Sequence, residues 1–278
     1  MTTHNDHITL VLGATGKTGR RVAQRLDERG VAVRRASRSG EPKFDWENHS
    51  TWAPALQGAS AAYVSFFPDV AVPGAPDTIA EFAELAVKLG ARRLVLLSGR
   101  GETEAQRAEQ ALQASGADWT VVRCSWFMQN FSEGYLLDPI LAGEVALPAG
   151  SVGEPFVDAE DIADVAAAAL TESGHVGQIY ELTGPRLLTF AEAVGEIARA
   201  TSRAIRYVPI SHEQYAAAMT AEGLPKEVVS ILDYLFREVL DGRNEQLADG
   251  AQRALGRPAR DFADYARDTA ASRVWSAR

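Results

Sequence analysis

Cysteine is almost absent from this 278-residue chain, which has one, Cys124, beside five histidines. A single cysteine cannot form an intrachain disulfide or supply the paired thiolates of a structural zinc site. His4 and His7 have a ligand-like spacing, but they stand in the polar segment TTHNDH, which is typical of a mobile tail. We therefore expect a chain that folds without disulfides and binds no metal.

Long apolar runs and clusters of basic residues are also missing. No segment approaches the roughly 20 apolar residues of a membrane helix, and the first residues lack the apolar core of a signal peptide. The 28 Lys and Arg are outnumbered by 37 Asp and Glu and stand at most in pairs. Because nucleic-acid binding needs clustered cations, we expect no direct nucleic-acid binding. From the missing apolar segments we expect no membrane partner and a cytoplasmic location.

A glycine-rich turn near the start of the chain carries the first functional signal. The phrase TGKTG resembles the lysine end of a nucleoside-triphosphate loop, but that loop needs a glycine where this chain has Val11. The pattern Gly13-x-x-Gly16-x-x-Gly19 fits instead, between the apolar run ITLVL and the helix-like KTGRRVAQRLDER. Strand, glycine turn and helix in this order favour a dinucleotide pyrophosphate at the helix N-terminus over a plain connecting turn.

The residues after the second strand-like segment, VAVRRASRS, indicate which dinucleotide binds. Proteins that bind NAD place an acidic residue about 20 positions after the glycines, where it holds the ribose hydroxyls. This chain has Ser37 and Arg38 there, Arg38 being 19 residues after Gly19. A guanidinium attracts a 2′-phosphate, so the sequence predicts NADP(H) as the cofactor. A solvated loop arginine is the alternative.

Strand-like and helix-like segments alternate along the first half of the chain, as in SAAYVSFF, DTIAEFAELAVKLG, RRLVLLS, EAQRAEQALQASG and DWTVVRCSW. This alternation predicts an α/β fold, a Rossmann-like doubly wound parallel sheet. The pattern loosens beyond about residue 132, and residues 211–240 are helix-like. We expect an NAD(P)-binding Rossmann domain over residues 1–155. A smaller carboxyl-terminal α/β lobe over residues 156–278 would bind the substrate and be partly interleaved with the Rossmann sheet.

The order of several motifs resembles the NmrA-like family of atypical short-chain dehydrogenases. These motifs are GATGKTG, Arg38, LLSG, TVVRCSWFMQNF, EDIADVAAAAL, YELTGPRLLTFAEAVGEIA and YVPIS, so the likeness covers essentially the whole chain. The chain looks most similar to the triphenylmethane reductase and NADPH quinone reductase branch. The resemblance implies a Rossmann domain that binds NADP(H).

The resemblance also implies roles for individual residues. Those expected around the pyrophosphate are Gly13, Thr15, Gly16, Lys17, Thr18 and Gly19. Those expected near the 2′-phosphate and adenine are Ser37, Arg38, Asp45 and Trp46. Those expected to close the fourth strand beside the ribose are Ser65, Phe66 and Phe67. Those expected to approach the nicotinamide are Ser98, Gly99 and Cys124, of which Cys124 is interpreted as a small buried residue rather than a reactive thiolate.

One departure from ordinary short-chain dehydrogenases narrows the chemistry. Those enzymes protonate their substrate with a tyrosine followed four positions later by a lysine, and none of the four lysines here follows a tyrosine in that way. The segment where the pair belongs reads RGETEAQRAE. NmrA-like proteins typically lack this pair, so the catalytic residues stay unknown and an acceptor that needs no strong proton donor is favoured.

Two functions stay open on the sequence alone. The first is an NADPH-dependent reductase that transfers hydride to a quinone-like or other electrophilic small molecule without a Tyr-Lys pair. The second is a non-catalytic NADP-binding redox sensor that acts on a protein partner. The residues expected to line the substrate pocket are Phe127, Met128, Phe131 and Tyr234. The sequence leaves a homodimer open.

Overall fold

The computed structural model describes residues 8–276 and divides into two compact units. The described part of unit 1 comprises residues 8–124, 159–182 and 249–257, and unit 2 comprises 125–158, 183–248 and 258–276. A single boundary at residue 155 does not describe this division, because the chain returns to unit 1 twice after leaving it at residue 124. His4 and His7 lie outside the described residues.

Unit 1 is built on a parallel sheet of six strands, which confirms the Rossmann-like α/β fold predicted from the alternating pattern. The strand order is β2-β1-β3-β4-β5-β7, so the chain moves outward from β1 first in one direction and then in the other. The strands are β1 (Ile8–Leu12), β2 (Ala32–Ala36), β3 (Ala59–Val64), β4 (Arg93–Gly99), β5 (Asp118–Cys124) and β7 (Gln178–Leu182).

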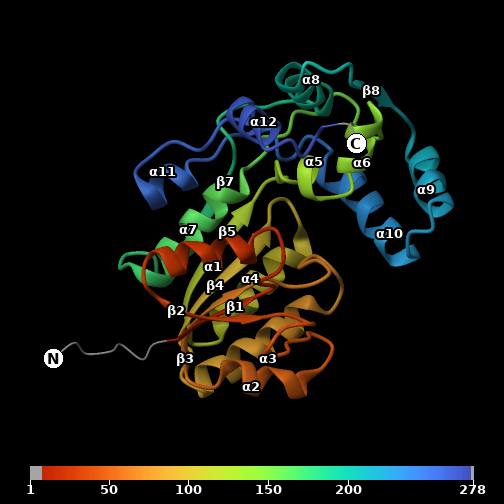
Figure 1. Cartoon of the computed structure of the whole chain (residues 1–278). Coiled ribbons are helices and arrows are strands. Elements are labelled where there is room, and N and C mark those ends of the chain that lie inside the picture. The colour runs from red at the N-terminus through yellow and green to blue at the C-terminus, as the bar shows by residue number, and fades with distance from the viewer. Residues whose placement is uncertain (1–7, 277–278) are drawn as a thin grey trace. The chain divides into compact units, whose positions relative to one another are not determined.

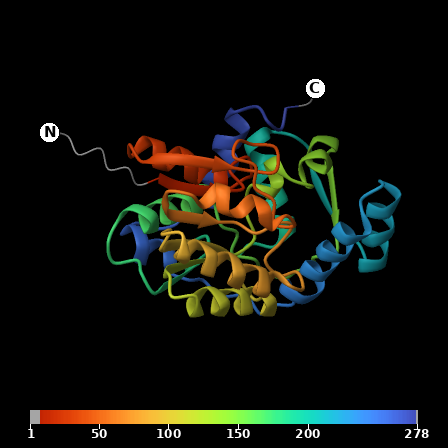
Figure 2. The ribbon, with the colours of Figure 1, turned by 90° about the horizontal axis from the view of Figure 1, so that it is seen from below.

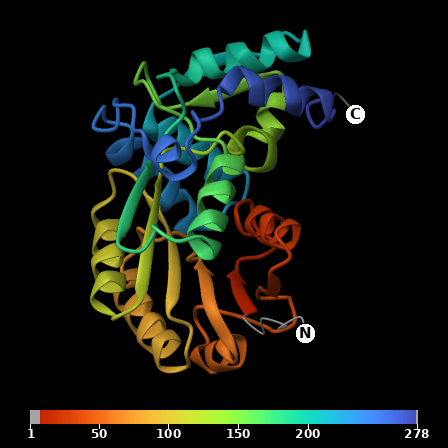
Figure 3. The ribbon, with the colours of Figure 1, turned by 90° about the vertical axis from the view of Figure 1, so that its left-hand side faces the viewer.

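Helices cover both faces of this sheet. In Figure 3, α1 and α7 lie on one side of the strands, and α3 and α4 lie on the other. Figure 2 shows α3 and α4 side by side. The helices of unit 1 are α1 (Gly19–Glu28), α2 (Trp52–Leu56), α3 (Ala75–Lys88), α4 (Thr103–Ala114), α7 (Ala159–Thr171) and α11 (Gly250–Leu255), with a 3₁₀ turn, η1 (His49–Thr51), before α2.

Apolar periodicity explains how these helices pack. In α3, the buried residues include Ile79, Phe82, Ala83 and Ala86, which recur at the spacing of one helix face. Burial of that face against the sheet supplies most of the helix stability, because short isolated helices are marginal in water. Long-range packing therefore fixes the loops at the carboxyl ends of the strands, where the candidate site lies.

Unit 2 has its own small sheet and core. Its two strands, β6 (Glu144–Leu147) and β8 (Arg206–Pro209), are parallel, and α8 packs beside α12, as Figure 3 shows. Buried aromatic rings, Phe131, Phe156, Phe190 and Phe262 among them, fill the core. The helices are α5 (Asn130–Glu133), α6 (Leu137–Ala142), α8 (Phe190–Thr201), α9 (His212–Ala221), α10 (Lys226–Tyr234) and α12 (Phe262–Ala271), with a π-helical turn, η2 (Leu235–Val239), after α10.

No helix within residues 8–276 is both long enough and apolar enough to cross a membrane.

Candidate functional site

Residues 13–19, here called the phosphate turn, connect β1 to α1 at the carboxyl edge of the sheet of unit 1. Gly13 has a positive φ of 63°, a conformation that favours glycine, and its carbonyl accepts a hydrogen bond of 2.8 Å from the amide of Gly16. A Cβ on Gly19 would lie 2.7 Å from the carbonyl carbon of Gly13, so only glycine lets α1 start this close to the strand. The three glycines therefore form a tight turn from strand to helix, as the sequence predicts.

The N-terminus of α1 is suited to an anion. Helix N-termini carry partial positive charge and unsatisfied amide groups. The first turn of α1 has no acidic residue, and Thr18 makes no side-chain capping bond. Thr15 and Gly16 are exposed, Lys17 is half-buried and Thr18 is buried. This cradle fits the pyrophosphate of a dinucleotide, since it offers main-chain amides in a turn too tight for side chains at its glycines.

The phosphate turn lies where the strand order changes direction, between β1 and β3. In open α/β sheets, ligands bind in the crevice at such a switch point. A Cβ on Gly13 would lie 3.6 Å from the hydroxyl of Ser65, which directly follows β3. Ser65 thus lies beside the turn, and the strand it follows is the third of the chain and not the fourth. Its place beside the ribose stays a prediction. Residues 43–44 lie where a further strand could form, but only an isolated bridge joins Lys43 to Ser37.

Arg38 and Phe67 form a cation–π pair across the ends of β2 and β3. The guanidinium carbon of Arg38 lies 4.0 Å from the centre of the Phe67 ring, and the ring is 53% exposed. Arg38 is also exposed, and it makes no ion pair with any of the residues 8–276. A cation that stacks on an exposed ring and has no carboxylate partner is suited to bind an anion beside a planar group.

The loop after β2 is held by its own backbone and by buried aromatic rings. The carbonyl of the buried Ser37 accepts from the amides of Gly40 and Phe44, at 3.2 and 2.9 Å. The indole of Trp46 donates to the carbonyl of Ser65 at 3.1 Å, and its ring lies 4.8 Å from that of Phe66. The loops after β2 and β3 are therefore fixed to each other.

Asp45 and Trp46, expected to flank adenine, have clear structural roles in this loop. Trp46 is buried in the core, and the main-chain carbonyl of Asp45 accepts from the indole of Trp52 at 3.0 Å. The Asp45 side chain is half-buried and accepts from the amide of Glu47. Contact of either residue with adenine stays a prediction.

The ends of β4 and β5 carry the residues expected near the nicotinamide. Ser98 is buried, and its hydroxyl donates to Glu109 at 2.6 Å, so this hydroxyl serves a buried network that also contains Arg123. Cys124 is buried as well, and burial raises the pKa of its thiol above the usual range. A thiol kept protonated in this way is unreactive, which agrees with the small buried role predicted for Cys124.

Two carboxyl groups that the sequence did not single out lie at the same edge. Glu102 follows β4 and is 7% exposed, and Asp69 follows β3. Burial, followed by the charge of Asp69, raises the pKa of Glu102 to about 8, and burial also raises the pKa of Asp69. The segment RGETEAQRAE looks like a solvated helix start, so nothing in the sequence pattern indicates that its first glutamate is buried.

The four residues expected to line the substrate pocket all belong to unit 2 and differ in exposure. Met128 and Phe131 are completely buried in the core of that unit. Both side chains pack within this core in the structure, and a pocket role for them stays a prediction. Phe127, paired with Val157 in an isolated bridge, and Tyr234 are half-buried and stay candidates.

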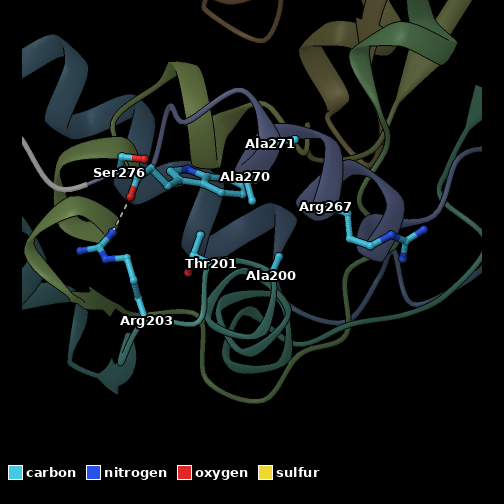
Figure 4. Close-up of a pocket in the computed structure, with 8 residues that line it drawn as sticks. Ala200, Thr201, Arg203, Arg267, Ala270, Ala271 and Ser276 are labelled. Carbon is cyan, nitrogen blue, oxygen red and sulfur yellow. Dashed lines mark hydrogen bonds between the residues drawn. The ribbon is translucent and has the colours of Figure 1, made fainter.

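A surface pocket of about 390 Å³ lies within unit 2, between α8 and α12 (Figure 4). Its arginines are already engaged. Arg203 donates to the carbonyls of Trp275, at 2.8 Å, and Leu141, at 2.7 Å, and Arg267 pairs with Asp264. None of the predicted site residues lines this pocket. Within residues 8–276, no group of His, Cys, Asp or Glu could hold a metal ion.

Comparison with known proteins agrees with this geometry. Residues 13–173 match the family model described as NAD(P)H-binding. The chain is 31% identical over 271 residues to the uncharacterized oxidoreductase YesF of Bacillus subtilis, with 92% of this chain and 93% of that protein covered. It is also 31% identical over 287 residues to the NAD(P)H azoreductase of Xenophilus azovorans, with 95% and 98% covered.

Solved structures share the fold at lower identity. Triphenylmethane reductase of Citrobacter sp., complexed with NADP(H), has a TM-score of 0.73 at 19% identity, with 95% of this chain and 99% of that chain covered. The Escherichia coli NADPH-dependent quinone oxidoreductase QOR2, complexed with NADPH, has 0.76 at 20%, with 94% and 99% covered. NmrA, a negative transcriptional regulator, has 0.68 at 16%, with 96% and 97% covered. The resemblance to NmrA-like proteins is thus confirmed at the level of the fold.

Proposed function

This chain belongs to the family of NAD(P)H-binding proteins, and from that premise we propose that it is an NADPH-dependent reductase. Its substrate would be a quinone-like or other electrophilic small molecule. The main observation behind the proposal is that two cationic features occur together. The first turn of α1 has no acidic residue, and Arg38 stands just after β2, stacked on Phe67. Relatives and structural neighbours named as azoreductase, quinone oxidoreductase and triphenylmethane reductase support the acceptor class.

Each part of unit 1 has a role in holding the cofactor. The amides of the phosphate turn and the N-terminus of α1 would bind the pyrophosphate. Arg38 would hold the 2′-phosphate, and its stacking on Phe67 would fix the guanidinium in place. The bound cofactor would supply a hydride to the acceptor. Because the chain has no Tyr-x-x-x-Lys sequence, its proton chemistry cannot follow that of ordinary short-chain dehydrogenases.

The preference for NADPH over NADH follows from the charge at Arg38. Charge-assisted hydrogen bonds contribute about 1.5–3 kcal/mol each, which corresponds to roughly a tenfold to hundredfold difference in Kd. Replacing Arg38 by alanine should therefore weaken NADPH binding by about that factor and leave NADH binding nearly unchanged. Fluorescence titration with both nucleotides measures the two constants.

The matched control for that variant is Arg35→Ala, which removes an equal charge three residues earlier, within β2. Arg35 is exposed and pairs with Asp27 of α1, so its loss should leave the NADPH/NADH ratio unchanged. Equal losses of NADPH and NADH binding in Arg38→Ala would show that Arg38 does not bind the 2′-phosphate.

The reductase itself is tested by following NADPH absorbance with purified protein and a panel of acceptors, namely a naphthoquinone, an azo dye and a cationic triphenylmethane dye. Protein-dependent oxidation of NADPH by at least one acceptor supports the proposal. Tight NADPH binding without turnover across the panel would support the alternative, a sensor that acts on a protein partner. A cytoplasmic location and a homodimer stay predictions.

A further inference from the structure

Glu102 is a buried carboxyl group without an evident structural purpose. It stands directly before α4, but its side chain does not cap that helix. Its Oε2 atom is buried and has no hydrogen-bond partner among residues 8–276. An unsatisfied buried carboxylate is costly, so a fold that keeps one needs a reason for it.

The backbone of β4 makes room for this carboxyl group. A Cβ on Gly99, the last residue of β4, would lie 2.7 Å from Cδ of Glu102. The glycine therefore leaves open the space that the carboxyl occupies. Glu102 is thus held against the carboxyl end of β4 by the shape of the strand end and not by a salt bridge.

The charged groups around Glu102 favour its protonated form. From the loop after β3, the carboxyl of Asp69 acts on it through its charge, while Asp69 itself accepts from the amide of Ala71 at 2.8 Å. Glu102 is buried and Asp69 is half-buried. Two such carboxyl groups that influence each other cannot both ionise easily, so one of them retains a proton near neutral pH. Asp69 has an amide donor to stabilise its negative charge, and Glu102 has none among the described residues, so the proton belongs on Glu102.

The arginines on the neighbouring strands do not stabilise the ionised form of Glu102. On the β4 side, Arg100 lies 3.4 Å from Glu181 of β7. On β5, Arg123 pairs with Glu109 of α4 and, at 2.7 Å, with Glu181. Each of these arginines therefore faces a carboxylate other than Glu102. Burial remains the main influence on the protonation of Glu102.

The topology puts Glu102 toward the reacting end of a bound dinucleotide. Arg38 follows β2 and the phosphate turn follows β1, so the adenosine half of a bound dinucleotide would lie over that side of the switch point. The other half of a dinucleotide held there would extend across β3 toward the ends of β4 and β5. Glu102 lies between β4 and α4, at that end of the sheet.

We propose that Glu102 is the proton donor of the reduction proposed above, and the inference rests on that function. The acceptor would gain a hydride, that is, the two electrons and the hydrogen nucleus that the cofactor would lose. Negative charge would then develop on an oxygen or nitrogen atom of the acceptor. That atom takes the carboxyl proton of Glu102, so an O–H or N–H bond forms and the carboxyl O–H bond breaks. The resulting carboxylate regains its proton from water.

This role divides acceptors into two classes. Quinones, azo compounds and imines become anionic on hydride addition unless a proton is delivered, so they depend on Glu102. A cationic triphenylmethane dye becomes neutral when it accepts hydride and needs no proton. Assays of one protein preparation with both acceptor classes therefore separate hydride transfer alone from hydride transfer coupled to protonation.

The test is Glu102→Gln, which keeps the shape of the side chain and removes the acidic proton. At neutral pH, naphthoquinone and azo reduction should fall by about 10²–10⁴-fold, the usual contribution of a general acid. Reduction of the cationic dye and the Kd for NADPH should not change. The matched control is Glu104→Gln in the first turn of α4, where the side chain pairs with the exposed Arg107. This control should keep activity toward all three acceptors.

A readout independent of turnover is infrared difference spectroscopy on the protein without nucleotide. Wild type should show a protonated carboxyl band at pH 7 that disappears as the pH rises through about 8, and Glu102→Gln should lack it. The rate of quinone reduction should fall over the same range, while the rate with the cationic dye stays level. In Asp69→Asn, the band should disappear at lower pH, because the charge that opposes ionisation of Glu102 has gone.

Full quinone and azo activity in Glu102→Gln, or no protonated carboxyl band in wild type at pH 7, would overturn the inference. Either result leaves the reductase intact if wild type still reduces the cationic dye. Wild type that binds NADPH and reduces none of the three acceptors would overturn the proposed function and this inference together.

Discussion

At the scale of single residues, Gly19 carries the closest approach in the phosphate turn. A Cβ at this position would overlap the carbonyl of Gly13, and α1 would have to move away from β1. We expect Gly19→Ala to lower the free energy of unfolding by about 1–3 kcal/mol, as overpacked positions do, and to weaken NADPH binding. Urea unfolding and nucleotide titration measure the two effects.

A helical glycine with room for a methyl group provides the control. Gly195 lies in α8, where a Cβ would lie 3.5 Å from the Arg199 side chain, an ordinary contact. Gly195→Ala should raise the free energy of unfolding by about 0.5–1 kcal/mol, because alanine is the better helix former. Equal effects of the two substitutions would show that Gly19 is not required for close packing of α1 on β1.

Glu102 should make the stability of the protein depend on pH. Its pKa is raised from 4.5 to about 8 on folding, so between these values the folded chain holds a proton that the unfolded chain has lost. Stability from this group is therefore fully present below about pH 4.5 and is lost as the pH rises to about 8, by at most about 1.4 kcal/mol per pH unit. In urea unfolding, the stability of Glu102→Gln relative to wild type should rise across this range.

The Glu104→Gln variant again serves as the control for that measurement. Glu104 is the next carboxyl group along the chain and pairs with Arg107, so this variant gives the reference for removing a carboxylate from the same segment. A pH-independent difference for Glu102→Gln would mean that Glu102 ionises in the folded protein as easily as in the unfolded chain.

At the scale of elements, α1 is attached to α7 by a group of ion pairs within unit 1 (Figure 1). Glu160 accepts from Arg21 and Arg25, each at 2.6 Å, and Asp164 accepts from Arg25 at 2.7 Å. These groups are partly buried, with 12–27% of each side chain exposed. The network therefore fixes the helix whose N-terminus belongs to the phosphate turn.

Loss of this network should be measurable as a salt-dependent change in stability. Glu160→Gln leaves two arginines without that carboxylate, and we expect it to lower the free energy of unfolding by about 1–2 kcal/mol, more than an isolated surface pair. The loss should shrink in 1 M salt, where the Debye length falls to about 3 Å. A loss no larger than that of Glu104→Gln would show that the network does not anchor α1.

The spacing of apolar residues predicted most elements of unit 1, because apolar residues recur at a regular interval over several helix turns or along a strand. The helix expected over 17–29 is α1, which covers Gly19–Glu28. The strand expected over 60–67 is β3, which covers Ala59–Val64, so it starts one residue earlier and ends three residues earlier than expected. The pair η1 and α2 was missed, because α2 has five residues and contains Pro54, too short a segment to show a period. The return of the chain to the sheet as α7 and β7 was expected only as a partial interleaving, since strand pairing depends on long-range packing.

The candidate site was predictable where chemistry depends on local sequence. The glycine spacing and Arg38 can be recognised because a turn and a strand end fix their surroundings. Glu102 and Asp69 could not be recognised, because their burial arises from strands that the sequence does not show to be neighbours. Met128 and Phe131 are buried in the core, a placement that the sequence does not distinguish from a pocket wall, since apolar residues suit both equally.

At the scale of the whole molecule, the chain carries a net charge of −9, yet its proposed ligand is a polyanion. Attraction must therefore be local, from the N-terminus of α1 and from Arg38, and it should weaken as salt rises. The division into two units assigns every predicted cofactor residue to unit 1 and every predicted pocket residue to unit 2. Cofactor affinity and acceptor choice should therefore respond to different sets of substitutions.

The most direct test of this account is a titration of the wild-type protein with NADPH and NADH under identical conditions. The account predicts saturable binding of NADPH about tenfold to hundredfold tighter than that of NADH. Equal affinities, or no binding of either nucleotide, would contradict the assignment of the phosphate turn and Arg38 as an NADPH site.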